Sequence, residues 1–284
     1  MEFITRQQQI WGRAFKLFME NDALSAAGNM AFLAMLSLFP FIIFLVALSG
    51  FLGQSDAGLE GIAFLLAVVP PEVSVVIQGP IQGIIKSTGP EILTTSILFA
   101  IWTAAAGVEA ARGVIVKAYG REYARAIWIH RLESLAVVVF SGVAVILAMA
   151  TLVLGPSLIA AVTSLFPDTY TAEMNKIWSY LQLLISPALL MLGLYSVFFA
   201  LTPRKAQNPV RLPGTLLAMA MLYATAKGLS AYLRYADNYD VTYGSLAGVV
   251  ILQVFCFLIS IGFVLGAELN AAYSLHKQQT AGAN

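Results

Sequence analysis

The 284-residue chain has few charged residues and very few cysteine or histidine side chains. Only 11% of its residues are charged, whereas the share in a typical soluble protein is about 25%. Cys256 is the only cysteine, so no internal disulfide framework can form. The two histidines, His130 and His276, stand far apart and form no zinc-binding pattern. We therefore expect neither a metal nor another cofactor.

An excess of charge of one sign is also missing. Sixteen Lys and Arg residues against fifteen Asp and Glu residues give a net charge of +1. Long-range attraction to nucleic acid is therefore not expected. The phosphate-binding pattern G-x-x-x-x-G-K-[ST] does not occur, so direct use of ATP is not expected either. Residues 1–20 are polar and of mixed charge, unlike a signal peptide, so we expect the first apolar segment to be retained.

Apolar residues make up 59% of the chain, and the mean hydropathy is +0.81. A helix that crosses a bilayer needs about 20 mostly apolar residues. Six segments qualify, and together they predict an all-α polytopic membrane protein in which residues 1–284 form a single transmembrane domain. These predicted spans are 29–52, 92–110, 133–155, 181–201, 213–233 and 246–270.

The distribution of Lys and Arg predicts the orientation of these spans. Twelve of the sixteen lie in the tails or in the connections between the second and third and between the fourth and fifth spans. Only Lys86, Lys176 and Arg234 lie on the opposite side, and Lys227 lies within a span. Because loops rich in Lys and Arg stay in the cytoplasm, both termini are predicted to be cytoplasmic.

Two amphipathic segments flank the spans. Residues 1–20 place apolar side chains on one helical face and cations beside it, which predicts a cytoplasmic helix drawn to anionic lipid. The outer loop 53–91 contains a second apolar stripe at helical spacing. That stripe predicts an interfacial helix or, alternatively, a cap packed over the bundle.

Polar residues within apolar spans are candidates for a substrate path. Lys227 faces either a cavity or the outer headgroups, which its long side chain can reach. Asn29 needs a hydrogen-bond partner in the bilayer, on another helix or in a cavity. Glu268 and Asn270 end the sixth span, where Glu268 could pair with Arg112 or Arg204, or act as a gate.

Other candidates have simpler structural explanations beside a functional one. Pro40 and Pro187 predict kinks in the first and fourth spans. Glu109 and Arg112 are three residues apart and predict a local ion pair. One further set forms either the outer rim of a substrate path or a simple turn: Asp237, Asp240, Tyr243 and Gly244. A second set consists of cations that either contact lipid headgroups or merely follow the positive-inside rule: Arg112, Lys117, Arg121 and Arg125.

Four motifs resemble the YihY/BrkB family of bacterial inner-membrane proteins. The first runs from Asp22 to Pro40 and begins D-A-L-S-A-A-G. The others are L-P-G at 212–214, Y-G-S-L-A-G at 243–248 and G-A-E-L-N-A at 266–271. The resemblance implies several spans, cytoplasmic termini and an inner-membrane location. Some members were once labelled ribonuclease BN, but this sequence has neither clustered metal ligands nor a basic RNA surface, so we reject that activity.

The leading functional hypothesis is transport or flipping of an amphiphilic or anionic envelope molecule such as a lipid. A non-transporting scaffold or envelope assembly factor is the alternative. An intramembrane enzyme is a weaker alternative, since only Glu109 and Glu268 could supply paired carboxylates and no triad is present. Membrane lipids are the expected partners. The sequence does not determine the oligomeric state.

Overall fold

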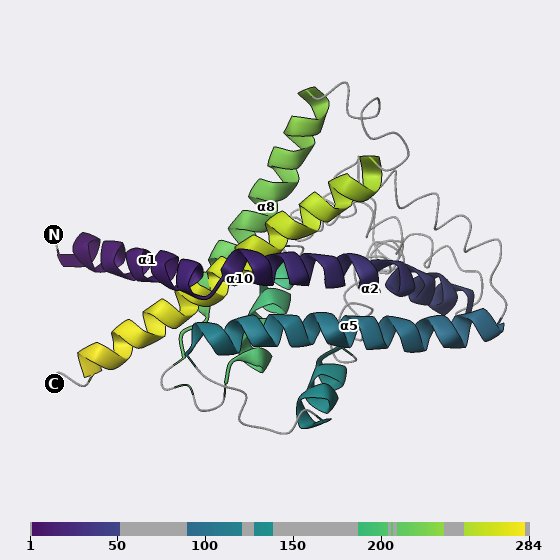
Figure 1. The fold of residues 1–284 in the computed structure, drawn as a ribbon, viewed down its shortest axis with the longest axis horizontal. Coiled ribbons are helices and arrows are strands. Elements are labelled where there is room, and N and C mark those ends of the chain that lie inside the picture. Colours follow the sequence, from purple (N-terminus) through teal and green to yellow (C-terminus); the bar gives the residue numbers. More distant parts are fainter. Residues whose placement is uncertain are drawn as a thin grey trace, which may run out of the picture.

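The computed structural model describes residues 2–51, 90–120, 128–138, 187–203, 206, 209–235 and 247–281. Within these ranges every regular element is a helix. Figure 1 shows both termini at the same end of the molecule.

Two helices separated by a tight turn open the chain. α1 (Glu2–Glu20) and α2 (Ala23–Phe51) are joined only by Asn21 and Asp22. Asp22 has a φ of 52° in the left-handed region, which Asp tolerates better than most residues. Its backbone N–H donates to Met19, and its carbonyl accepts the N–H of Ala26. The backbone of Asp22 is therefore hydrogen-bonded to both helices.

The next described helix, α5 (Pro90–Ala118), packs along α2. It begins at a proline, whose missing N–H is no loss in the first turn of a helix. It is followed by Gly120 with a φ of 61°, a conformation that glycine adopts without strain. Figure 1 shows α2 and α5 running in opposite directions, so the end of α5 lies at the start of α2.

Four described helices remain. They are the segment 128–138, Pro187–Leu201, α8 (Leu212–Tyr235) and α10 (Ala247–Ala281). α10 contacts α1, α2, α5 and α8. In Figure 1 it crosses the molecule diagonally, between α8 and the pair formed by α1 and α2.

The core around α10 is built largely from small side chains. On α2, Ala23, Ala27 and Ala31 recur every four residues and are almost completely buried. Ala267 and Ala271 are their counterparts on α10, and both are fully buried. Small side chains let helix backbones approach closely, which is how helices in membranes gain packing contacts.

The closest approach of two helices joins α8 to α10. A Cβ atom added to Gly214 would overlap the carbonyl oxygen of Gly266, and one added to Gly266 would lie 2.5 Å from the carbonyl oxygen of Gly214. One turn earlier on α10, a Cβ atom on Gly262 would lie 2.6 Å from the Cβ of Met221. Glycine is therefore required at this crossing by the space available.

The helices agree with the predicted spans in part. α8 and the start of α10 match the predicted spans closely, but α2 begins six residues early and α5 and α10 continue beyond their predicted ends. In the described ranges one helix, Gly248–Thr280, is long and apolar enough to cross a membrane, whereas Ala23–Ser37 and Pro187–Leu201 are shorter apolar helices. Six crossings therefore remain a prediction.

Several expectations fall outside the described residues. They concern the predicted interfacial helix in 53–91, most of the span 133–155, the first part of the span 181–201, and the side chains of Arg121, Arg125, Arg204, Asp237, Asp240, Tyr243 and Gly244. Of the two prolines, Pro40 lies inside the continuous helix α2, and Pro187 is the first residue of the described helix Pro187–Leu201.

Candidate functional site

The last motif of the sequence, G-A-E-L-N-A, holds the start of α8 in place. The backbone N–H of Gly214 donates to Oδ1 of Asn270 at 2.7 Å. Gly214 lies in the first turn of α8, where backbone N–H groups have no partner within the helix. Pro213 has no N–H to satisfy. One side chain of α10 therefore caps α8, and the glycine in L-P-G lets α10 come close enough to do so.

Glu268 of the same motif joins α10 to the turn between α1 and α2. It is only 1% exposed, and its Oε1 accepts a 2.8 Å hydrogen bond from Nδ2 of Asn21. The backbone carbonyl of Asn21 accepts a 2.5 Å hydrogen bond from Nζ of Lys117 on α5. Asn21 therefore links three helices. Glu268 does not pair with Arg112, as one sequence-based alternative held, because Arg112 faces other carboxylates.

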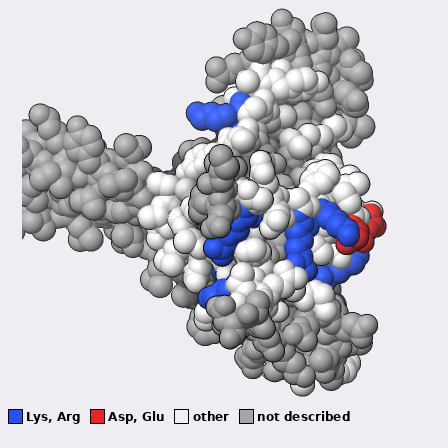
Figure 2. All heavy atoms as spheres, turned by 90° about the vertical axis from the view of Figure 1, so that its left-hand side faces the viewer, with Lys and Arg blue, Asp and Glu red and all other residues white. Residues whose placement is uncertain are grey.

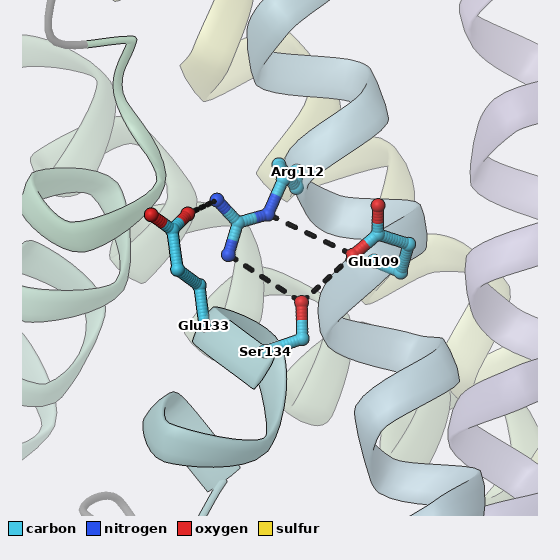
Figure 3. Close-up of polar contacts among 4 residues, drawn as sticks. All are labelled: Glu109, Arg112, Glu133 and Ser134. Atoms are coloured by element: carbon cyan, nitrogen blue, oxygen red, sulfur yellow. Dashed lines mark hydrogen bonds and ion pairs between the residues drawn. The ribbon is translucent and has the colours of Figure 1, made fainter. Parts of the chain in front are cut away.

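Arg112 forms a polar cluster with Glu109, Glu133 and Ser134 (Figure 3). Its Nη1 lies 2.9 Å from Oε2 of Glu133, and its Nε lies 3.7 Å from Oε2 of Glu109. The Ser134 hydroxyl donates to Oε2 of Glu109 at 2.7 Å. The predicted ion pair of Glu109 and Arg112 is confirmed. The cluster also joins α5 to the segment 128–138, which the sequence did not reveal.

An open-sided cavity of about 590 Å³ lies between α2 and α5, next to this cluster. We call it the α2–α5 groove. Its wall has polar and charged side chains together with small and apolar ones. The lining residues are Asn21, Asp22, Ala26, Asn29, Leu33, Ala106, Glu109, Ala110, Gly113, Val114, Lys117 and Arg131.

The groove can accommodate a molecule with a charged part and an apolar part. Lys117 and Asp22 lie where α5 ends and α2 begins. Arg131 packs over the ring of Trp102 at 4.8 Å, farther from that end. Ala26, Ala110 and Val114 form an apolar surface between charged groups. Apolar walls with a few polar groups are typical of small-molecule sites.

The predicted substrate-path residues are not brought together. Asn29 lines the groove. Lys227 is exposed on α8 and is not among the groove residues, while Glu268 and Asn270 are buried at the helix junction. Of the predicted headgroup cations that the structure describes, Lys117 lines the groove and Arg112 is only 6% exposed.

Four charged groove residues were not proposed from the sequence as one site. Asp22, Glu109 and Arg131 join Lys117 in the wall. Glu109, Gly113 and Lys117 are four residues apart and so share one face of α5. That spacing was visible in the sequence, but nothing in it indicated that α2 would face this side of α5.

Comparison with known families decides the identity of the chain. A family model described as Virulence factor BrkB matches residues 14–284. The chain belongs to the BrkB family. The match covers all of the described helices except the first part of α1.

Among relatives of this BrkB-family protein, one from Bacillus subtilis is named putative ribonuclease-like protein YfkH. It is 26% identical over 268 residues, covering 93% of this chain and 94% of the relative. A UPF0761 membrane protein of Aliivibrio fischeri is 27% identical over 270 residues, covering 92% and 83%. Another of Pseudoalteromonas translucida is 25% identical over 276 residues, covering 96% and 88%. No solved structure matches.

These relationships place the BrkB-family chain among membrane proteins. Several exposed apolar side chains on its helices agree with lipid surroundings, among them Phe32 on α2, Trp102 on α5 and Phe199 in Pro187–Leu201. Exposure of so many aromatic rings to water would be unfavourable, whereas contact of these rings with lipid tails is favourable.

Proposed function

We propose that this protein binds an amphiphilic envelope molecule, such as a lipid, in the α2–α5 groove and moves it across or out of the inner membrane. The single observation that carries the proposal is the composition of the groove wall. Charged side chains and an apolar surface share one open-sided cavity between two apolar helices. A lipid that enters sideways would place its tails against apolar residues and its headgroup against the charged ones.

The proposed orientation places both termini in the cytoplasm. Figure 1 shows the N- and C-termini at one end, and Figure 2 views the molecule from that end. In Figure 2 blue Lys and Arg atoms gather in several patches on this face, with few red acidic atoms visible. Segments rich in Lys and Arg remain on the cytoplasmic side of a bilayer. The Lys117 end of the groove would then open near the inner leaflet.

A vesicle assay tests the proposal. The purified chain is reconstituted into liposomes that contain a fluorescent lipid, and movement between leaflets is followed by chemical quenching of the outer leaflet. Ala110→Trp fills the groove with a large ring. Ala224→Trp places the same ring at an exposed site on α8, outside the groove. We expect Ala110→Trp to lose lipid movement and Ala224→Trp to keep it. Equal rates in both variants would contradict a role for the groove.

A scaffold is the second candidate function, and exposed side chains of α1 favour it. Trp11, Phe15 and Met19 recur every four residues and are 45%, 63% and 61% exposed, respectively. α1 also buries Ile10 and Ala14 against α10, so its apolar surface is wider than its packing needs. Both variants are expressed in a strain that lacks the gene. Rescue of that strain by Ala110→Trp, together with failure of Trp11→Ser to rescue it, would favour the scaffold over the transporter.

A further inference from the structure

The charges that line the α2–α5 groove balance one another. Lys117 and Arg131 supply two cations, and Asp22 and Glu109 supply two carboxylates. A headgroup with only negative charge would be attracted by the first pair and repelled by the second. The wall is therefore not complementary to a simple anion, although an anionic substrate was one expectation from the sequence.

Glu109 has an acceptor to offer to the groove. Its Oε2 accepts from Ser134 and faces Nε of Arg112, whereas no described residue donates to its Oε1. Figure 3 shows that second oxygen pointing away from both Arg112 and Ser134. The closer partner of Arg112 is Glu133, at 2.9 Å. Arg112 therefore lies farther from Glu109, at 3.7 Å, than from Glu133, and the side chain of Glu109 remains 30% exposed.

Cations lie on both sides of Glu109 along α5. Lys117 is eight residues later, which is about 12 Å along a helix, and its ammonium has donors left after bonding the carbonyl of Asn21. Trp102, which holds the guanidinium of Arg131, is seven residues earlier, or about 10 Å. Neither Lys117 nor Arg131 forms an ion pair with a described residue. Along the direction of α5, the groove thus presents a cation, then a carboxylate and then a second cation.

We infer that the groove binds a zwitterionic headgroup with a primary ammonium and a phosphate, as in phosphatidylethanolamine. The inference rests on the proposed function, because it names the class of molecule that the groove takes. Glu109 Oε1 accepts from the ammonium, and a flanking cation, Lys117 or Arg131, binds the phosphate. Loss of a charge-assisted hydrogen bond of this kind lowers affinity about tenfold or more.

Lipid competition tests the inference. The full chain is purified in detergent with equal amounts of phosphatidylethanolamine and phosphatidylglycerol, and retained lipids are counted by native mass spectrometry. We expect the unmodified protein to retain phosphatidylethanolamine preferentially. Glu109→Gln should lower that preference about tenfold. Glu133→Gln is the matched control, because it makes the same change within the Arg112 cluster but away from the groove wall.

The possible outcomes separate the headgroup from the site. Preference of the unmodified protein for phosphatidylglycerol would overturn the zwitterionic assignment and leave the proposed groove intact. An equal loss of preference in Glu109→Gln and Glu133→Gln would also overturn it, because the effect would then come from the cluster. Retention of both lipids by Ala110→Trp at the level of the unmodified protein would show that lipid binds elsewhere and would remove the proposed groove itself.

Discussion

The side chain of Asn270 caps the first turn of α8 by accepting the backbone N–H of Gly214. The two residues are 56 positions apart and belong to different sequence motifs. Glu268, two residues before Asn270, holds the α1–α2 turn through Asn21. One turn of α10 therefore fixes the positions of two other helices, and its polar residues have a structural role that precedes any direct role with substrate.

The crossing of α8 and α10 requires glycine at position 214. Gly214→Ala is expected to destabilise the protein by about 1–3 kcal/mol, because the new methyl group meets backbone atoms that cannot move aside. Gly228→Ala in the same helix is the control, since a Cβ atom there meets nothing within 4 Å. Thermal unfolding in detergent, followed by loss of helical circular dichroism, measures both. Equal stability of the two variants would contradict the close crossing.

The hydrogen bond between Asn21 and Glu268 should contribute to stability. Asn21→Ala removes the donor and leaves a buried carboxylate without its described partner, so we expect a loss of about 1.5–3 kcal/mol. Glu268→Gln keeps an oxygen that can accept the same hydrogen bond and should cost less. The free energy of unfolding in denaturant distinguishes the variants. A larger loss in Glu268→Gln would show that the charge, rather than the hydrogen bond, is needed.

The buried guanidinium of Arg112 should be costly to remove. Arg112→Gln removes the buried cation that lies against both Glu109 and Glu133, and we expect a loss of about 3 kcal/mol. Lys16→Gln breaks the exposed pair of Lys16 and Glu20, where less than about 1 kcal/mol is expected. Unfolding of both variants under identical conditions makes the comparison. Similar losses would mean that the Arg112 cluster is not a stabilising contact.

Docking of α1 on α10 depends on one face of α1. Ala14 is fully buried against α10, whereas its neighbour Phe15 is 63% exposed. Ala14→Arg is therefore expected to release α1 and speed proteolytic cleavage within residues 2–20, and Phe15→Arg is expected to leave the cleavage rate unchanged. Limited proteolysis followed by mass spectrometry reads out both. Faster cleavage of Phe15→Arg alone would place the packed face of α1 on its other side.

The sequence alone identified much of the secondary structure. The break at Asn21 and Asp22 separates an amphipathic helix from an apolar one, and both helices are present. The start of α8 at L-P-G and the pairing of Glu109 with Arg112 were also predictable, because they depend on neighbours within about one helical turn. The ends of α5 and α10 were not, since a helix stabilised by packing continues past the apolar boundary that defines a span.

The groove was decided only by the tertiary structure. Its wall combines Asp22 and Asn29 with Lys117 and Arg131, which come from segments about 90 residues or more apart in sequence. Whether Lys227 belongs to a substrate path stays a prediction. Hydropathy and charge counts report which residues prefer lipid or water, and they carry no information on which surfaces of the helices pack together. That choice follows from close packing of small residues and from polar side chains such as Asn270 and Glu268, whose partners are distant in the chain.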